Sequence, residues 1–370
     1  MARTADVVII GGGIHGCSTA LHLALRGLKP ILIEKDYAGR HASGVNAGGV
    51  RQLARDLLEI PLSIASMELW ERIEELVGDD CGFSSHGTVL IAESDEELAG
   101  FRERVDDLHL RGLTHEELID RAELKRLVPA VSDYCPGGVV SRRDGAADPF
   151  RTTQAFRRRA VEEGAEIIEG VTVTGLTRVG SNWRVETSDG AFEAPKVVNA
   201  AGAWADRIAA MLGEPVPLTV VAPMLMVTSA LAPFIEPVVI LRGRKLSFKQ
   251  RENGTVVIGG GHLATPYRDR NETVIDWNKL ALSARTVWEL FPAMHEATIV
   301  RAWAGIEAYM PDGVPVVGRS STSEGIFHQF GFSTHGFQLG PATGAVMAEL
   351  VATGSTNTPI DGLGIERFRP

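Results

Sequence analysis

The sequence predicts a mixed α/β protein in which two domains are assembled from segments that lie far apart in the chain. The first observation is a βαβ unit at the N-terminal end, where residues 6–10 and 30–34 read as buried parallel strands around a helical stretch at 14–26. The second is that strand patterns fill residues 217–262, whereas α/β pieces return near 150–215 and at the C-terminal end. We therefore expect one α/β unit and one unit with a mostly antiparallel sheet, interleaved along the chain.

Hydrophobic periodicity and glycine or proline signals give the remaining elements in order. Helical patterns cover residues 57–77, 95–127, 151–163, 276–291 and 341–352. Strand patterns cover residues 83–92, 165–201 and 298–309, and a last strand follows Gly325. Gly164 is the expected C-cap of the 151–163 helix, and Pro341 is expected near the first turn of the last helix.

The composition is that of a globular protein with a surplus of acidic residues. The 370 residues carry a formal net charge of −10, so the surface as a whole is not suited to nucleic acid or anionic lipid. No apolar run reaches the roughly 18 residues that a membrane span requires. The three cysteines lack CxxC spacing and fit a reducing, cytoplasmic environment, and the ten histidines show no metal-binding spacing such as HxxxH. We expect no metal site, and an anionic ligand must meet a local basic cluster.

A G-x-G-x-x-G motif at residues 11–16 follows the first strand and opens the first helix. Its glycines, Gly11, Gly13 and Gly16, allow a tight turn and a close approach of the backbone to a pyrophosphate. The helix start then offers unpaired N–H groups to the phosphates. Glu34 ends the second strand, where a carboxylate can accept bonds from a ribose hydroxyl. This context favours a dinucleotide site over a glycine-rich turn beside a surface glutamate.

Two further glycine-rich stretches favour FAD over NAD. Residues 41–51 are mostly small and allow the backbone to pass close to a flat ring such as isoalloxazine, while Ser43 and Asn46 add hydrogen-bonding side chains. Residues 331–344 read as a strand, a turn and a helix, whose positive end suits the pyrimidine edge of a flavin. The alternatives are a flexible surface loop for the first stretch and an ordinary capped helix for the second.

With these motifs the sequence resembles the D-amino-acid-oxidase-like superfamily of FAD-dependent oxidoreductases. Within it the sequence is similar to the glycine and sarcosine oxidase branch, near opine oxidase and iminodiacetate oxidase-like enzymes. The resemblance covers nearly the whole chain, through DVVIIGGGIHG at 6–16 and the stretches 42–49, 144–149, 197–205, 302–318 and 331–344. It implies a discontinuous Rossmann-like FAD-binding domain of residues 1–82, 146–216 and 318–370, and a substrate-binding domain with a large, mostly antiparallel sheet of residues 83–145 and 217–317.

The resemblance also implies which residues contact the cofactor. Ile14 and His15 fall at the pyrophosphate, Glu34 and Lys35 at the adenosine ribose, and Val173 at the adenine. The cysteine that carries the flavin in monomeric sarcosine oxidase falls near Gly305, so we expect FAD to be bound without a covalent link. The expected cofactor-binding residues are Gly11, Gly13, Ile14, His15, Gly16, Glu34, Lys35, Ala42, Ser43, Asn46, Ala47, Gly48, Gly49, Val173, Ala201, Gly202, Trp204, Gly305, Phe332, Ser333, Thr334, His335, Gly336, Phe337 and Gln338.

The sequence departs from the family pattern at the residues that hold the substrate carboxylate. The two arginines of glycine oxidase fall at Glu307 and Thr334, and the lysine of sarcosine oxidase falls at Gln338. Plain glycine oxidase or monomeric sarcosine oxidase activity is therefore doubtful. We therefore expect another cationic side chain to bind the substrate carboxylate.

Residues 242–251 carry five positive charges in ten positions, and they offer such cations. Alternation along a strand would put Ser247, Lys249 and Arg251 on one face. With Arg51 they would clamp one or two carboxylates of an amino acid, an opine or iminodiacetate. The alternative is a solvated edge strand whose charges prevent aggregation. The expected substrate-binding residues are Arg51, Ser247, Lys249, Arg251, Trp303 and Thr334.

The predicted reaction is oxidation of a small amino acid at its C–N bond by hydride transfer to flavin N5, which gives an imine that hydrolyses. The chemistry requires positioning rather than a catalytic side chain, and His335, Gln338 and His262 are candidates to bond flavin or substrate, or to serve only packing. The alternatives are a 2-hydroxy-acid dehydrogenase, a non-catalytic flavin subunit and a NAD-binding protein. The electron acceptor is either oxygen or a partner subunit, and the oligomeric state is left open.

Overall fold

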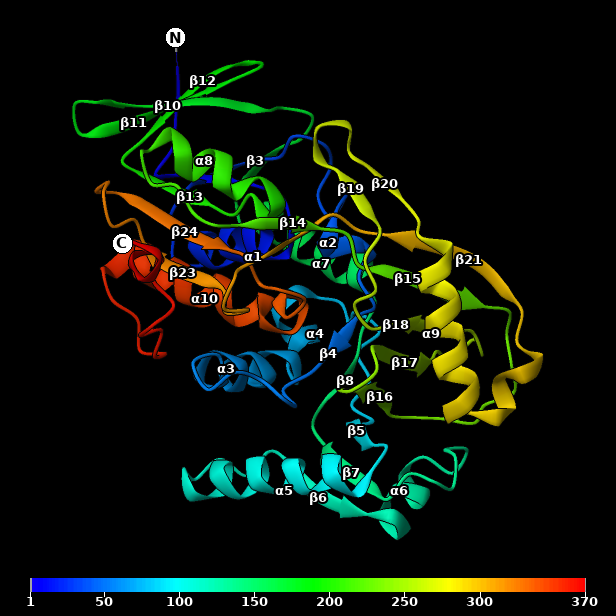
Figure 1. The fold of residues 1–370 in the computed structure, drawn as a ribbon. Coiled ribbons are helices and arrows are strands. Elements are labelled where there is room, and N and C mark those ends of the chain that lie inside the picture. Colours follow the sequence, from blue (N-terminus) through cyan, green and yellow to red (C-terminus); the bar gives the residue numbers. More distant parts are fainter. Residues whose placement is uncertain (1, 370) are drawn as a thin grey trace.

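A six-stranded sheet forms the centre of the first structural unit in the computed structural model, which describes residues 2–369 (Figure 1). Its strand order is β23-β24-β13-β2-β3-β9, and all neighbours are parallel except the edge pair β23 and β24. The strands are β2 (Val7–Ile10), β3 (Pro30–Ile33), β9 (Glu166–Ile168), β13 (Lys196–Asn199), β23 (Val316–Arg319) and β24 (Ile326–Phe330).

The two faces of this sheet are covered by different layers, and β2 shows why its sequence is apolar throughout. Val7 and Ile9 pack into a core with the helices on one face. Val8 and Ile10 pack on the other face against a smaller sheet and α8 (Ala205–Met211). A strand buried on both faces needs apolar residues at every position, which explains the run Val-Val-Ile-Ile. The smaller sheet contains β1 (Arg3–Thr4), β10 (Val173–Val179), β11 (Asn182–Thr187) and β12 (Gly190–Ala194).

The helical layer is held by a close approach of its two central helices, α1 (Ile14–Ala24) and α10 (Gly336–Thr353). A Cβ atom on Gly344 would lie 2.1 Å from Ser18 Oγ and 2.6 Å from the Ser18 carbonyl carbon. Glycine therefore sets the separation of the two helices here. The layer also contains α3 (Ile60–Trp70), α4 (Ile73–Val77) and α7 (Pro149–Glu162).

An eight-stranded sheet forms the second unit, in the order β21-β15-β18-β17-β16-β5-β7-β6. Only β16 and β5 pair in parallel, and the other neighbours are antiparallel. Helix α9 (Trp277–Leu290) covers one face, and α5 (Asp95–Leu110) packs on part of the other. The strands are β5 (Thr88–Ala92), β6 (Glu117–Asp120), β7 (Gly137–Ser141), β15 (Met224–Thr228), β16 (Val238–Leu241), β17 (Leu246–Gln250), β18 (Val256–Gly259) and β21 (Ile299–Ala304).

Three short strand pairs place loops between the two large sheets. They join β4 (Gly49–Val50) to β8 (Gly145–Ala146), β14 (Thr219–Val221) to β22 (Glu307–Tyr309), and β19 (Thr265–Tyr267) to β20 (Glu272–Val274). The β19–β20 hairpin leaves the second unit and reaches towards β3 (Figure 1). At its tip Asn271 Oδ1 accepts a bond from Lys35 Nζ at 2.6 Å. Arg268, between the two strands, donates to the Ala203 carbonyl at 2.8 Å.

The predicted mixed α/β class is confirmed, but several expected elements differ in detail. The helix expected at 57–77 is divided into α3 and α4, and the stretch 95–127 contains strand β6 between α5 and α6 (Arg121–Leu127). The strand expected at 298–309 breaks after Ala304 into β21 and β22. The last helix begins at Gly336, so Pro341 lies inside it. Pro341 is the sixth residue of this helix, so its missing N–H leaves the Phe337 carbonyl without its usual helical donor.

The strands of the second sheet come from residues 88–141 and 224–304, as the interleaved pattern predicts, although the domain boundaries themselves stay a prediction. All three cysteines are buried and free. Within residues 2–369 no helix has the length and apolar character to cross a membrane. In the same range no group of three or more His, Cys, Asp or Glu side chains is placed to hold a metal ion.

The contact between α1 and α10 gives a stability prediction. Replacing Gly344 with Ala should lower the free energy of unfolding by about 1–3 kcal/mol, because the new methyl group overlaps Ser18. Gly100→Ala in α5 is the matched control, since that glycine is exposed and has open space around its Cβ position. The control should gain about 0.5–1 kcal/mol from helix propensity. Urea unfolding checks both, and an equal gain in the two variants would contradict the packing argument.

Candidate active site

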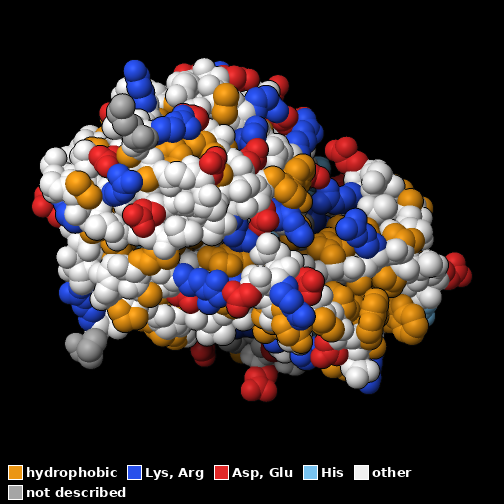
Figure 2. All heavy atoms as spheres, turned by 90° about the horizontal axis from the view of Figure 1, so that it is seen from above, with side chains coloured by type: hydrophobic (Ala, Val, Ile, Leu, Met, Phe, Trp, Pro, Cys, Tyr) orange, Lys and Arg blue, Asp and Glu red, His pale blue; other side chains and the backbone are white. Residues whose placement is uncertain are grey.

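A cavity of about 980 Å³ lies between the two units and is lined by loops from both. Seen from above, Lys and Arg side chains gather about a recess in the surface (Figure 2). The lining brings together glycine-rich stretches that are distant in the sequence, as the sequence predicts. The glycine-rich stretches are 11–15, 39–49 and 329–337, and the lining also takes residues from 200–204 and 305–309.

The start of α1 forms one wall and leaves backbone donors free. Its N-cap, Gly13, has no capping side chain, and the Ile14 N–H donates to Ser43 Oγ at 3.0 Å. Gly11 has φ +112°, and a Cβ there would lie 2.3 Å from the Ala200 carbonyl oxygen. Gly16 is needed for a different contact, because its Cβ would lie 1.9 Å from the Gly11 carbonyl oxygen. An open helix start with glycine in the preceding loop fits a pyrophosphate.

Glu34 follows β3 and fixes the loop that precedes α1. Its Oε2 accepts the Gly12 N–H at 2.6 Å, and its Oε1 accepts the Asp36 N–H at 2.9 Å. Burial raises the pKa of Glu34, although the two backbone bonds act in the opposite direction. Next to it Lys35 Nζ lies 4.0 Å from the ring centre of Trp204, and both residues line the cavity. This wall offers polar groups and an indole to an adenosine.

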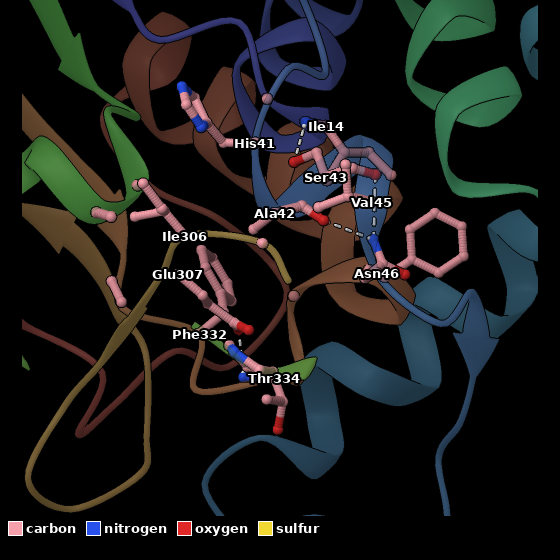
Figure 3. A pocket seen from close by; sticks show the side chains of 18 of the residues that line it. Ile14, His41, Ala42, Ser43, Val45, Asn46, Ile306, Glu307, Phe332 and Thr334 are labelled. Carbon is pink, nitrogen blue, oxygen red and sulfur yellow. Dashed lines mark hydrogen bonds between the residues drawn. The ribbon is translucent and has the colours of Figure 1, made fainter. Parts of the chain in front are cut away.

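The loop at 42–49 is held in place by its own side chains and by β21. Asn46 Nδ2 donates to the Ala42 carbonyl at 2.9 Å, and Asn46 Oδ1 accepts the Gly48 N–H at 2.7 Å (Figure 3). Trp303 Nε1 donates to the Val45 carbonyl at 2.8 Å. A Cβ on Gly48 would lie 2.2 Å from the Ala147 carbonyl oxygen. These contacts do not fit a flexible surface loop.

The turn before α10 closes another side of the cavity with strained backbone. Ser333 and Thr334 have φ values of +50° and +72°, which non-glycine residues rarely adopt. The Thr334 N–H donates to Glu307 Oε1 at 2.5 Å, and Ser333 Oγ accepts the Met310 N–H at 3.1 Å. Phe332 stacks on His15 with 3.7 Å between ring centres. Strain of this kind is retained where the surrounding structure fixes it, most often at functional sites.

Arg51, Arg55 and Arg104 are three of the arginines that line the cavity, and we call them the arginine group. Arg104 binds Glu116 through two bonds of 2.8 and 2.9 Å. Arg55 is only 2 % exposed, and its Nε and Nη1 have no hydrogen-bond partner within residues 2–369. Its Nη2 makes two bonds of 3.4 Å, to the His335 carbonyl and to Gln338 Oε1. Burial lowers the pKa of Arg55 to about 9, and the charge of Arg51 adds to this effect.

The free nitrogens of Arg55 indicate that an anion belongs beside them. A buried donor without a partner costs about 1–3 kcal/mol, and more when it is charged. Arg55 was not among the expected substrate-binding residues. The only signal was its spacing of four residues from Arg51, in the segment Arg51-Gln-Leu-Ala-Arg55 that follows the small-residue loop.

His335 and Glu59 form a buried pair behind the arginine group. His335 Nδ1 lies 2.9 Å from Glu59 Oε2. Burial lowers the pKa of His335 to about 4, with the charge of Arg55 acting in the same direction. Burial alone would raise the pKa of Glu59, but the His335 bond and nearby positive charge bring it below its ordinary value. The pair is therefore a neutral imidazole that donates to a carboxylate.

Most of the expected site residues line the cavity. This group contains Arg51, Ser247, Gly11, Gly13, Ile14, His15, Glu34, Lys35, Ala42, Ser43, Asn46, Ala47, Gly48, Gly49, Val173, Ala201, Gly202, Trp204, Gly305, Phe332, Thr334, Gly336 and Phe337. Among the described residues the lining does not include Gly16, His262, Ser333, His335, Gln338, Lys249, Arg251 or Trp303.

Gln338 and Trp303 use their polar groups for structural contacts. Gln338 is fully buried and bonds Ser63 through both its amide nitrogen and its oxygen. Trp303 supports the loop at 42–49 through its hydrogen bond to the Val45 carbonyl. His262 contributes its backbone carbonyl to Met224 at 2.8 Å and lies beside, not in, the lining.

The predicted carboxylate clamp on β17 does not form as expected. Ser247 lines the cavity, but β17 ends at Gln250, and Arg251 pairs with Asp148 at 3.5 Å. Lys249 is buried beside the loop at 42–49, where its Nζ would lie 3.1 Å from a Cβ on Gly48. Within the described chain this nitrogen has no hydrogen-bond partner.

The model of the DAO family, described as FAD dependent oxidoreductase, matches residues 6–350. The chain is 27% identical to sarcosine oxidase subunit beta of Rhodobacter capsulatus, over 98% of this chain and 88% of that protein. It is 28% identical to mouse mitochondrial sarcosine dehydrogenase over 100% of this chain, which spans only 42% of the length of that relative. The solved structure of L-proline dehydrogenase from P. horikoshii superposes with a TM-score of 0.92 and 30% identity, and the match covers 100% of this chain and 98% of that chain. The resemblance found in the sequence is confirmed.

The buried Lys249 gives a prediction about pH. Burial lowers its pKa to about 7, whereas an unfolded lysine titrates near 10.4. Between these values only the unfolded chain holds the proton, so this contribution to stability rises with pH above about 7. The free energy of unfolding of the wild type, relative to Lys249→Met, should increase by about 1–2 kcal/mol from about pH 7 to about pH 9.

Denaturant unfolding of the flavin-loaded proteins measures this difference at each pH. Lys29→Met, at an exposed position, controls for the loss of a lysine. A difference that stays constant or falls with pH would show that Lys249 does not reside in the folded protein as a neutral amine.

Proposed function

Because the chain belongs to the family of FAD dependent oxidoreductases, we propose that it oxidises a small amino acid at its C–N bond. The substrates to consider are of the sarcosine, glycine, proline, iminodiacetate or opine type. The observation that carries the proposal is Arg55, a buried cation with free donors that faces the same cavity as the cofactor loops. When bound there, FAD supplies the acceptor for a hydride from the carbon next to the nitrogen.

The cavity lining offers contacts for each part of FAD. The start of α1 at Ile14 and His15 would hold the pyrophosphate, and Glu34 and Lys35 would hold the ribose, with Val173 beside the adenine. The loop at 42–49 and the turn at 332–337 would enclose the flavin. The three buried cysteines do not line the cavity, and Gly305 occupies the place of the family's covalent cysteine, which supports non-covalent binding.

Arg51 and Arg55 would bind the carboxylate of the substrate. Guanidinium groups hold carboxylates through charge-assisted, often paired, hydrogen bonds. Their burial strengthens the interaction, since little water competes for the same donors. Arg242 and Lys245 also line the cavity and would serve a second carboxylate in a substrate such as iminodiacetate.

The electrons leave either to oxygen or to a partner subunit. A partner is a specific alternative because the Rhodobacter relative is itself named as a subunit. Admission of air to the substrate-reduced protein decides between the two: rapid return of the oxidised flavin spectrum favours an oxidase, and a persistent reduced spectrum favours a partner.

The proposed function predicts the outcome of a substrate panel. Under anaerobic conditions L-proline, sarcosine, glycine, iminodiacetate and an opine are mixed separately with the flavin-loaded protein, with L-lactate as the hydroxy-acid comparison. At least one amino acid should bleach the oxidised flavin band, and lactate should not. Bleaching by lactate alone would favour a 2-hydroxy-acid dehydrogenase. No bleaching by any compound would favour a non-catalytic flavin subunit.

The arginine group predicts a change in KM. Arg55→Met should raise KM for the amino acid by about 10- to 100-fold, which is the loss of a charged hydrogen bond of about 1.5–3 kcal/mol. Arg251→Met is the matched control, because Arg251 lies outside the cavity and pairs with Asp148. Flavin content checks that both variants are folded. The assignment is wrong if Arg251→Met raises KM and Arg55→Met does not.

A further inference from the structure

Glu307 is a carboxylate in the cavity that neither the cofactor nor the arginine group requires. It begins β22, pairs with Val221 of β14 and lines the cavity between Ile306 and Ala308. Figure 3 shows its carboxylate beside Thr334, on the side where Phe332 lies. Oε1 accepts the Thr334 N–H, and within residues 2–369 no other hydrogen bond reaches the carboxylate. One oxygen is therefore free towards the cavity.

The surroundings of Glu307 leave its charge without a counter-ion. Burial raises the pKa of Glu307 to about 7, and the Thr334 N–H offsets only part of this effect. Tyr309, on the same strand, is the titratable neighbour, and its pKa is raised to about 12 by burial and then by Glu307. On the turn, the His335 imidazole faces Glu59 instead. The neighbouring strand β14 and the 42–49 loop contribute no titratable side chains.

A partly buried carboxylate with a free oxygen in the cavity wall is suited to a cation. In the family pattern this position resembles an arginine of glycine oxidase, which holds a carboxylate, so the sign of the charge is reversed here. A cationic amine at Glu307 would supply the missing counter-ion and a hydrogen-bond donor together.

Glu307 and Arg55 contact adjacent residues of one turn. The Thr334 N–H bonds Glu307, and the next residue, His335, offers its carbonyl to Arg55 Nη2. Adjacent Cα atoms lie about 3.8 Å apart. An α-amino acid carries its amine and its carboxylate on one carbon. A negative group and a positive group on either side of one turn match that arrangement.

We propose that Glu307 binds the amino group of the substrate and accepts the proton that this group loses before oxidation. The inference rests on the proposed function and narrows its substrate class to amino acids that arrive as ammonium ions. In the step, an N–H bond of the ammonium breaks and its electron pair stays on nitrogen. The proton forms an O–H bond with the free oxygen of Glu307. The carboxylate becomes neutral, the amine becomes neutral, and the nitrogen lone pair is then available to assist departure of the hydride.

The first test measures binding without turnover. The flavin-loaded protein is reduced with dithionite under anaerobic conditions, and calorimetry compares L-proline with tetrahydrofuran-2-carboxylate, and sarcosine with methoxyacetate. Each pair differs only in whether nitrogen or oxygen stands beside the reacting carbon. The wild type should prefer at least one amine over its ether partner, and Glu307→Gln should reduce that preference by about 10- to 100-fold. An unchanged preference in Glu307→Gln overturns the inference.

The second test follows the pH dependence of anaerobic flavin reduction. The wild-type rate should rise with pH through about 7, where Glu307 becomes the carboxylate. Glu307→Gln should lose this rise, and its rate should increase only near the higher pKa of the free amine. Glu307→Asp should restore the lower rise in part. A profile unchanged in Glu307→Gln contradicts the proton step.

Controls separate this inference from the proposed function. Glu272→Gln, at an exposed position of β20, should match the wild type in both tests. Flavin content shows whether each variant is folded. If no amino acid reduces the flavin, the proposed function falls, while the binding comparison still judges Glu307. If amino acids reduce the flavin and Glu307→Gln behaves as the wild type, the function stands and the role of Glu307 falls.

Discussion

The close approach of backbone segments around the start of α1 is the constraint on which the cavity depends. Gly16 brings the helix against the Gly11 carbonyl, and Gly344 brings α10 against Ser18 of the same helix. Side chains at these points would push α1 away from β2 and α10. The open helix start and the 332–337 turn would then no longer face one cavity. The glycines therefore act through distances between secondary-structure elements as well as through loop conformation.

The turn before α10 organises charge in the part of the cavity that we propose for the substrate. The turn contains the left-handed residues Ser333 and Thr334. Its Thr334 N–H donates to Glu307, and its His335 carbonyl accepts from Arg55. Glu59 and His335 support the turn from outside the cavity lining. The backbone of the turn thus separates Glu307 from Arg55, so that these opposite charges do not neutralise each other in an ion pair. Each remains available to a ligand, at a cost in desolvation that a bound zwitterion would offset.

Local patterns predicted the fold class and most of the glycine-rich lining of the cavity. The βαβ unit, Glu34 and the small-residue loop depend on neighbours in the sequence, and the cavity lining contains nearly all of these residues. The substrate side depends on contacts across the chain. Lys249 and Arg251 had a plausible alternation, but Lys249 packs against Gly48, and Arg251 lies beyond the end of β17 and pairs with Asp148. Arg55 has no motif of its own, and only its burial beside His335 and Gln338 reveals it.

The β19–β20 hairpin connects the two units beside Lys35 and Ala203, which line the cavity. Its tip binds Lys35 through Asn271, and Arg268 binds both the Ala203 carbonyl and, at 2.6 Å, Asp206. A hinge opening that separated the two large sheets would have to break these bonds first. The hairpin therefore links the two units, and we expect exchange of a bound dinucleotide with the solvent to require the release of these polar contacts.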